Sequence, residues 1–321
     1  MSGAPAPVEV RSARVVGGYA LAAGLDEAAR SELYASARDL PGVDGFEISV
    51  GAPTWPEDRA ALHRAARRSA GPAAVVVTTI GLAAGLATGG MGIAAPDDEG
   101  RMAALRALRR ANDQVRSLAD RGHDIVAVQV HSYPTVDPSR SEDAGRSLQR
   151  SLIELASWDW CGAALVVEHC DARSAESAGS KGLLPLPVEL RAVRSAAEES
   201  STDIGVSLNT GRSAIEGRGA ATVVEHVRAA QRTGLLRGVI VSGATERYSP
   251  YGPAWADVHP PLRDRLPASA LTRTDVRAAF DEAVHPLRFD GAKVAPADAA
   301  AGIVERLTLL RTVVEALPGP R

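Results

Sequence analysis

The sequence predicts an α/β protein with a (β/α)8 TIM barrel fold, on three observations. Short β-branched apolar runs recur along the whole chain, and each is followed by a longer segment with apolar residues at helical spacings of three and four. The runs are almost entirely apolar, which is typical of a parallel sheet whose two faces are covered by crossover helices. Eight such units, of about forty residues each, account for the 321 residues. We therefore expect a single barrel domain over residues 1–321.

The first four units follow this pattern closely. Their strands are expected in VVGGYAL from Val15, GFEIS from Gly45, AAVVVTTI from Ala73 and DIVAVQVHSY from Asp124. The helices after them are expected at about 26–39, 56–70, 97–121 and 139–158. Asp97 and Asp98 precede the third helix, where carboxylates favour the positive end of the helix dipole. Pro56 suits the first turn of the second helix, because the N–H that proline lacks would have no partner there.

The last four units repeat the pattern less regularly. Their strands are expected in GAALVVEHC from Gly162, DIGVSLNT from Asp203, LRGVIVSGA from Leu236 and, with the weakest pattern, HPLRFDGAKVA from His285. The helices are expected at about 186–200, where Pro187 marks the first turn, and at 218–233, 272–283 and 297–316. A doubly wound open sheet is the alternative fold. However, the first strand-to-helix turn, GGYALAAGLDEAAR, lacks the glycine spacing of a dinucleotide-binding fingerprint.

Two connecting segments are long and rich in glycine, alanine and serine. GLAAGLATGGMGIAAP, from Gly81, has no GK[ST] ending, so it is predicted to be a mobile loop and not a phosphate-binding loop. DARSAESAGSKGLLPLP, from Asp171, is also long for a connection between a strand and a helix. We expect both segments to cover the pocket at the mouth of the barrel and to be mobile.

Charge and composition exclude several classes of protein. The formal net charge of -3 argues against a nucleic-acid partner held by its phosphates, so none is expected. The two cysteines, Cys161 and Cys170, are too few for a disulfide scaffold or a four-cysteine zinc site. The start of the chain has no apolar run of signal-peptide length, and later apolar stretches are too short to span a membrane. We therefore expect a cytoplasmic protein with no membrane partner.

Lysine is unusually rare in this chain. Only two of the 36 basic residues are lysine, Lys181 and Lys293. A GC-rich genome explains the excess of arginine as a whole, but the positions of the two remaining lysines are of interest.

Polar side chains gather at the carboxyl ends of the expected strands, where a barrel of this type builds its site. These residues are Tyr19, Glu47, Thr78, Thr79, His131, Tyr133, Glu168, His169, Asp171, Asn209, Arg212, Ser242 and Lys293. Burying so many polar groups around one axis would cost several kcal/mol unless they were paired or lined a pocket. A pocket is the simpler interpretation.

Glu168 is the strongest single candidate. It follows a run of apolar residues, and an ionised carboxylate in such a place needs a metal, a cation or a proton nearby. The alternative is a salt bridge to an arginine at the mouth of the barrel. Glu47 is placed similarly on the second strand, and it either contacts substrate or ties strands together beneath the site. His131 is a metal ligand, a general acid or a hydrogen-bonded core histidine.

Three further residues extend the candidate site. In the loop after the seventh strand, Asp257 and His259 are two residues apart, so on an extended backbone they share a face and can bind one cation. Lys293 lies among small and apolar neighbours. A desolvated lysine there could act as a base, form a Schiff base or stabilise an oxyanion, or its stem could simply pass along the barrel rim.

Taken together, these strand-end residues resemble those of the xylose isomerase-like barrel superfamily, which includes sugar isomerases, ketose epimerases, inosose dehydratases and the endonuclease IV type of nuclease. The residues that carry the resemblance are Glu47, Glu168 in VVEHCD, the VSLNTGR turn, Arg247 with Gly252, and DVH from Asp257 to His259. The resemblance spans the whole chain and indicates an uncharacterised branch.

In the metal-dependent members, a divalent cation is held by a glutamate on strand five, an aspartate after strand six, a histidine ending strand seven and a glutamate on strand eight. Here Glu168 matches the first of these ligands, but Asn209 and Ser242 replace the next two, strand eight offers Asp290 or Lys293, and Arg212 replaces a histidine of the turn. An amide is a poorer cation ligand than a carboxylate, and arginine and lysine add positive charge.

Two arrangements of charge are therefore open. In the first, which we favour from the sequence, Glu168, Asp257 and His259 hold a divalent metal such as Mn, Mg, Zn or Co. In the second, Arg212 and Lys293 neutralise Glu168 without a metal.

The resemblance implies a carbohydrate-like small-molecule substrate and an isomerase or epimerase of sugars, sugar acids or polyols. Glu168 would abstract a proton next to a carbonyl, and Lys293, Arg212 or a cation would stabilise the enediolate. The substrate-binding residues would be Glu47, His131, Asn209, Arg212 and Arg247. The alternatives are a non-catalytic sugar-binding barrel and, less in keeping with the net charge, an endonuclease IV-like enzyme. A homodimer or homotetramer is expected.

Overall fold

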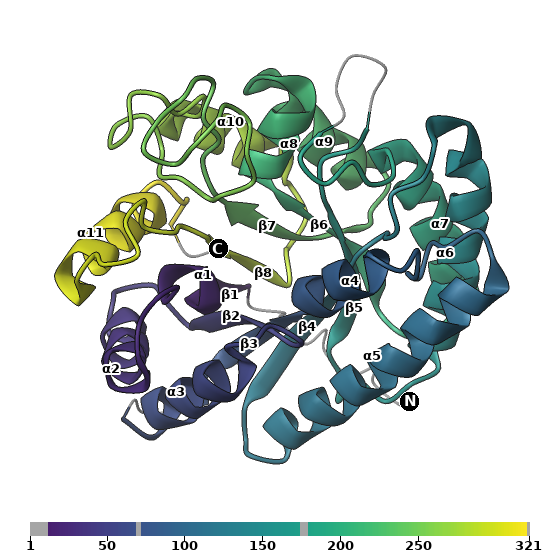
Figure 1. Ribbon diagram of the computed structural model, residues 1–321, viewed down its shortest axis with the longest axis horizontal. Coiled ribbons are helices and arrows are strands. Elements are labelled where there is room, and N and C mark those ends of the chain that lie inside the picture. The colour runs from purple at the N-terminus through teal and green to yellow at the C-terminus, as the bar shows by residue number, and fades with distance from the viewer. Residues whose placement is uncertain (1–11, 69–71, 174–178, 320–321) are drawn as a thin grey trace, which may run out of the picture.

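The computed structural model describes residues 12–68, 72–173 and 179–319, and it contains the predicted barrel. Eight parallel strands follow one another in chain order around the axis, and β8 pairs with β1 to close the sheet (Figure 1). The strands are β1 (Ala13–Gly17), β2 (Gly45–Ser49), β3 (Ala74–Thr78), β4 (Asp124–Val130), β5 (Ala164–His169), β6 (Ile204–Asn209), β7 (Leu236–Val241) and β8 (Phe289–Ala292).

Helices surround the barrel (Figure 1). They are α1 (Gly18–Leu21), α2 (Glu27–Arg38), α3 (Trp55–Arg68), α4 (Ile80–Ala87), α5 (Asp98–Ala119), α6 (Ser141–Ala156), α7 (Leu186–Glu198), α8 (Thr210–Gly217), α9 (Ala221–Arg232), α10 (Arg273–Glu282) and α11 (Ile303–Val314), with a short 3-10 helix, η1 (Pro138–Arg140), before α6. No helix in the described part of the chain is both long and apolar enough to cross a lipid bilayer.

The two larger apolar cores of the described residues stabilise this architecture. The larger one lies between the strands and the surrounding helices. The smaller one fills the barrel with side chains such as Val76, Val166 and Phe289. The Phe289 ring lies so close to Gly238 that a β-carbon there would come within 2.2 Å of it. The interior is therefore packed below the mouth, and a ligand can enter only from an end of the barrel.

Two of the helices begin at aspartate N-caps. Asp26 and Asp97 accept hydrogen bonds from the backbone N–H groups of Ala29 and Gly100, at the starts of α2 and α5. These bonds satisfy N–H groups that have no partner within the helix.

The largest difference from the prediction is in the segment from Gly81. It was predicted to be a mobile loop, but residues Ile80–Ala87 form the helix α4. Alanine and leucine, which are good helix formers, outweigh the glycines in this stretch. Figure 1 shows α4 lying over the barrel near β4 and β5. None of its residues is fully buried. The other expected cover, from Asp171, lies partly outside the described residues, at 174–178.

The pair between Arg30 of α2 and Asp58 of α3 is buried, with an N–O distance of 2.5 Å and side-chain exposures of 3% and 0%. We expect Arg30→Met to lower the free energy of unfolding by about 3 kcal/mol, because it leaves a buried carboxylate without its counter-charge. Urea denaturation at neutral pH measures this loss.

The matched control is Arg64→Met, which breaks an exposed pair with Glu27 between the same two helices. This substitution should cost less than about 1 kcal/mol, since solvent screens exposed pairs. Equal losses in the two variants would contradict the importance of burial here.

Candidate functional site

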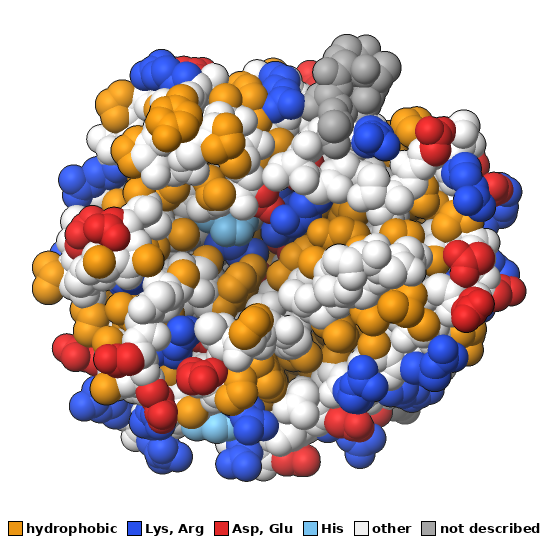
Figure 2. Space-filling model, in the orientation of Figure 1, with side chains coloured by type: hydrophobic (Ala, Val, Ile, Leu, Met, Phe, Trp, Pro, Cys, Tyr) orange, Lys and Arg blue, Asp and Glu red, His pale blue; other side chains and the backbone are white. Residues whose placement is uncertain are grey.

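The structure brings the strand-end residues together at the mouth of the barrel. Six of the sequence-predicted residues are at most 1% exposed there: Glu47, His131, Glu168, Asn209, Arg212 and Lys293. Figure 2 shows a hollow near the centre of this face, where histidine, basic and acidic side chains are visible among apolar ones. Their positions follow from the fold, because the carboxyl ends of all eight parallel strands meet at one end of the barrel.

Glu168, at the end of β5, lies at the centre of these contacts. One carboxylate oxygen lies 2.6 Å from Nη1 of Arg212, and the other lies 2.8 Å from Nε2 of His131. Burial alone would raise the pKa of Glu168, but Arg212 and Lys293 outweigh it and hold this pKa well below its usual range. Glu168 is therefore an ionised carboxylate in the resting site.

Lys293, directly after β8, connects two carboxylates. Its Nζ lies 2.5 Å from Glu47 and 3.6 Å from Glu168. Burial alone would lower the pKa of Lys293, but the two carboxylates outweigh it and raise this pKa above its ordinary value. Lys293 is thus a fixed ammonium suited to stabilising an oxyanion. The structure gives no support for Lys293 as a neutral amine that acts as a base or forms a Schiff base.

Glu47, in β2, has the opposite electrostatic character to Glu168. Burial raises the pKa of Glu47, and Lys293 only partly offsets this effect. The Tyr19 hydroxyl donates to Glu47 over 3.4 Å. The two carboxylates thus share one ammonium while their environments shift their pKa values in opposite directions, a pattern typical of paired acid and base groups.

Asp257, from the loop after β7, adds a third carboxylate. Its carboxylate lies 3.1 Å from Nε of Arg212, 2.8 Å from Nζ of Lys181 and 3.5 Å from Nδ1 of His259. Burial alone would raise the pKa of Asp257, but Arg212, His259 and Lys181 together hold it far below its usual range. The Arg212 guanidinium therefore lies between two carboxylates, Glu168 and Asp257.

Asn209 acts in this site through the backbone. Its side-chain oxygen accepts a hydrogen bond from the backbone N–H of Arg212 over 3.2 Å and from the Ser242 hydroxyl over 2.6 Å. Asn209 is thus the N-cap of α8, and it fixes the first turn of the helix that carries Arg212.

Several buried polar atoms at the mouth have no hydrogen-bond partner among the described residues: Nδ1 of His131, Nδ2 of Asn209 and Oε2 of Glu47. Because buried polar atoms are normally paired, this group indicates a place where a ligand supplies the missing bonds. Burial lowers the pKa of His131 although Glu168 opposes the shift. The ring is therefore neutral, and it donates from Nε2 to Glu168 and offers Nδ1 as an acceptor.

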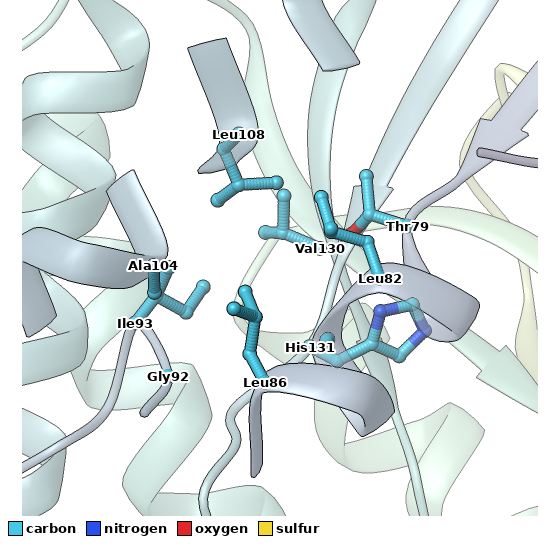
Figure 3. Close-up of a pocket in the computed structure, with 10 residues that line it drawn as sticks. Thr79, Leu82, Leu86, Gly92, Ile93, Ala104, Leu108, Val130 and His131 are labelled. Carbon is cyan, nitrogen blue, oxygen red and sulfur yellow. The ribbon is translucent and has the colours of Figure 1, made fainter. Parts of the chain in front are cut away.

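A small cavity adjoins His131 beneath α4. Figure 3 shows its apolar walls, which include Leu82, Leu86 and Ile93. Its volume of about 10 Å³ is close to the minimum that holds one water molecule. A sugar therefore cannot occupy this cavity unless α4 or its neighbours move.

The contacts of Glu168, Asp257 and His259 show whether these three predicted ligands could bind a divalent metal. A divalent ion bound to both carboxylates would need the volume that the Arg212 guanidinium occupies between them. It would also lie close to two further cations, Lys181 and Lys293. The donor set does not fit a divalent metal in this arrangement, and the geometry favours the alternative in which arginine and lysine neutralise Glu168.

The structure differs from the predicted site at two residues, Arg247 and Lys181. Arg247 is exposed, and its guanidinium bonds to the carbonyl of Pro267 and lies 3.6 Å from Glu246. No contact of Arg247 with the residues at the mouth is seen in the described part of the chain, so its role in substrate binding stays a prediction. Lys181 was not among the expected site residues, although its rarity could have singled it out, since both lysines of the chain lie at the mouth.

A second group of titratable residues lies beside β5, and we call it the rear histidine cluster: His169, Glu189, Glu216 and His226. His169 lies between Glu189, at 2.7 Å, and Glu216, at 3.1 Å. Burial alone would lower the pKa of His169, but the two carboxylates raise it to about 10. Ligand atoms of His169, Glu216 and His226 all lie within 4.8 Å of one another, which is close enough to hold a metal ion.

Comparisons with known proteins place these features in context. The family described as Domain of unknown function (DUF4862) matches residues 15–309. The chain is 33% identical over 225 residues to Uncharacterized protein STM3670 of Salmonella typhimurium. The aligned region covers 70% of this chain and 69% of that protein.

Solved structures share the barrel at low identity. A putative xylose isomerase from Rhodospirillum rubrum aligns with a TM-score of 0.63 and 14% identity, over 96% of this chain and all of that one. A D-allulose 3-epimerase from a Methylomonas species, solved with D-allulose, aligns with a TM-score of 0.56 and 14% identity, over 95% and 96% of the two chains. These likenesses establish the xylose isomerase-like fold.

The low pKa of Asp257 predicts a specific loss of stability in acid. As the pH falls below about 4, the carboxyl group binds a proton in the unfolded chain before it does so in the folded protein. The stability that Asp257 contributes is therefore complete above this pH and is lost as the pH falls. We expect Asp257→Asn to cost about 3 kcal/mol at pH 7 and to make the free energy of unfolding less dependent on pH between about 5 and 2.

Urea denaturation at a series of pH values measures this dependence. Asp281→Asn, which changes an exposed carboxylate on α10, is the control and should follow the wild-type curve. Parallel curves for wild type and Asp257→Asn would contradict the assignment.

Proposed function

The chain belongs to the family described as Domain of unknown function (DUF4862), and we propose that it is an isomerase or epimerase of a sugar, sugar acid or polyol. It would move a proton next to a carbonyl and use fixed cationic side chains at the barrel mouth in place of a metal. The observation that carries this proposal is the pair of buried carboxylates, Glu168 and Glu47, on either side of the Lys293 ammonium.

Proton removal falls to Glu168, because it is ionised and lies beside the cations Arg212 and Lys293. The carbon–hydrogen bond next to the substrate carbonyl breaks, the proton goes to Glu168, and the electron pair forms an enediolate. Lys293 and Arg212 would stabilise the negative charge on the enediolate oxygens, because they are preorganised cations in a site largely closed to water.

The low pKa of Glu168 makes it a weak base in the resting site. Substrate binding would raise this pKa and so make Glu168 a stronger base. A substrate oxygen that contacts Arg212 or Lys293 competes with Glu168 for their charge, so the pKa of Glu168 rises as the enediolate forms. The same contacts would thus activate the base and stabilise the intermediate.

The proton returns in one of two ways. Glu47, whose raised pKa makes it the more readily protonated of the two carboxylates, would protonate the opposite face of the same carbon and give an epimer. Alternatively, Glu168 would return the proton to the neighbouring carbon, that is, the former carbonyl carbon, while the proton of the adjacent hydroxyl moves to the former carbonyl oxygen, and this would give an isomer. His131 would accept a hydrogen bond from a substrate hydroxyl at its free Nδ1.

The choice of substrate class rests on the shared fold. The barrel resembles that of a D-allulose 3-epimerase solved with D-allulose, and a carbohydrate offers the hydroxyl and carbonyl groups that the polar mouth can bind. A non-catalytic carbohydrate binder is the second candidate, because the site residues contact one another closely and the adjoining cavity is small.

The test is exchange of the substrate's α-proton with deuterium, followed by NMR in D2O over a panel of ketoses, aldoses and sugar acids. We expect the wild type to exchange the α-proton of at least one compound. Glu168→Gln should lower this rate by about 100-fold or more, since the amide cannot accept the proton. Glu47→Gln should retain exchange but lose conversion to the epimer if Glu47 donates on the opposite face.

Glu32→Gln, on the exposed side of α2, is the matched control and should leave the rate unchanged. Exchange at the wild-type rate in Glu168→Gln would reject Glu168 as the base. Binding of a sugar with no exchange in the wild type would favour the non-catalytic candidate.

A further inference from the structure

The rear histidine cluster shares no residue with the group at the barrel mouth, although it lies directly behind it. Successive side chains of a strand point to opposite faces of the sheet, so His169 points away from the axis where Glu168 points towards it. Glu216 is in α8, His226 is in α9, and Glu189 is in α7. The cluster therefore joins four elements of the barrel wall.

The two histidines converge on one carboxylate. His169 Nε2 lies 3.1 Å from Oε2 of Glu216, and His226 Nε2 lies 3.5 Å from its Oε1. In a tetrahedral zinc site with bonds of about 2.0–2.1 Å, neighbouring ligand atoms are about 3.3 Å apart. The two observed distances, each to a different oxygen of Glu216, lie on either side of that value, and ligand atoms of the three residues lie within 4.8 Å of one another. The two rings meet edge to face with centroids 5.1 Å apart.

Each imidazole is also oriented by a bond at its other nitrogen. His169 Nδ1 bonds to Glu189 over 2.7 Å, and Glu189 in turn accepts from the Ser132 hydroxyl over 2.5 Å. His226 Nδ1 bonds to the Ser213 hydroxyl over 3.1 Å. A carboxylate or hydroxyl behind a histidine is the arrangement that orients metal-binding imidazoles and fixes which nitrogen faces the ion.

The charges in the cluster do not balance without another cation. Among the described residues, neither Glu189 nor Glu216 forms an ion pair with a lysine or arginine. A protonated His169 leaves one of the two carboxylates uncompensated, whereas a divalent cation bound to neutral histidines balances both. Buried carboxylates without such compensation are costly.

We propose that the rear histidine cluster is a zinc site in which His169 Nε2, Glu216 and His226 Nε2 are the protein ligands and water completes the tetrahedron. Two imidazoles and one carboxylate form a ligand set that suits Zn²⁺. Glu216 and His226 keep side-chain exposures of 19% and 13%, which leaves a path for the ion to enter. The site does not depend on the proposed reaction.

The ion would act on the barrel mouth from behind. His169 follows Glu168 in β5, and Glu216 lies one turn after Arg212 in α8. A bound zinc would link these two elements and so hold the buried pair between Glu168 and Arg212 in place.

Zinc titration of the metal-free full-length protein by calorimetry, with elemental analysis of protein purified without chelators, tests the site. We expect about one zinc per chain and, with Co²⁺ in its place, the visible absorption of a tetrahedral complex. Glu216→Gln and His226→Asn should weaken zinc binding by about 100-fold or more, and Ser213→Ala by about 10-fold, because it removes only an orienting bond.

Two controls separate this site from other histidines. His285→Asn changes an exposed histidine and should bind zinc normally. His259→Asn changes the histidine of the mouth and should also bind zinc normally.

Circular dichroism establishes whether each variant is folded. If His226→Asn does not fold, the expected tenfold weaker zinc binding of Ser213→Ala tests the proposal in its place. Absence of stoichiometric zinc in the wild type would overturn the proposal and mean that a proton alone fills the cluster. Loss of zinc in His259→Asn but not in Glu216→Gln would overturn it as well, in favour of a metal at the mouth.

Discussion

The buried contact between Glu168 and Arg212 is the interaction on which the barrel mouth depends. Two charges that are each 1% exposed lie 2.6 Å apart, and neither could be buried there alone at acceptable cost. The same guanidinium reaches Asp257, so one side chain joins the end of β5, the start of α8 and the loop after β7. Asn209 then fixes the helix turn from which Arg212 extends. This pair therefore links three separate segments of the chain at the mouth.

Charge is distributed along a chain of alternating signs. Glu47, Lys293, Glu168, Arg212, Asp257 and Lys181 contact one another in that order. Each carboxylate therefore has a cation beside it. Burial raises the pKa of both Glu47 and Glu168, but Arg212 and Lys293 together hold the pKa of Glu168 low, whereas Lys293 only partly offsets burial at Glu47. A reaction that creates negative charge on a substrate would meet cations already held in position, with little reorganisation needed.

Sequence patterns were sufficient for the barrel because most of the strands are nearly continuous apolar runs and most of the long helices have apolar residues at spacings of three and four. The same logic located Glu47, Glu168 and Lys293, since strand ends must meet at one end of a parallel barrel. The positions of side chains in the loops were harder to predict from the sequence. Nothing in the spacing of Asp257 and His259 indicates that Arg212 would lie between Asp257 and Glu168, or that Arg247 would turn outward. The cluster of His169, Glu216 and His226 joins residues far apart in the chain, so no local pattern indicates it. The helix α4 was not predicted, because its glycines are typical of a loop.

The balance of charge at the mouth also limits how such a site can change over evolutionary time. Three carboxylates, Glu47, Glu168 and Asp257, face three cations, Lys181, Arg212 and Lys293. Replacing Arg212 by a histidine, or Lys293 by a glutamate, leaves buried negative charge uncompensated and costs several kcal/mol, which is a large share of the stability of a typical domain. A lineage could pass between an arginine-centred and a metal-centred mouth only by changing several of these residues together or by acquiring stability elsewhere first. The site is in this sense a local optimum that single substitutions cannot easily leave.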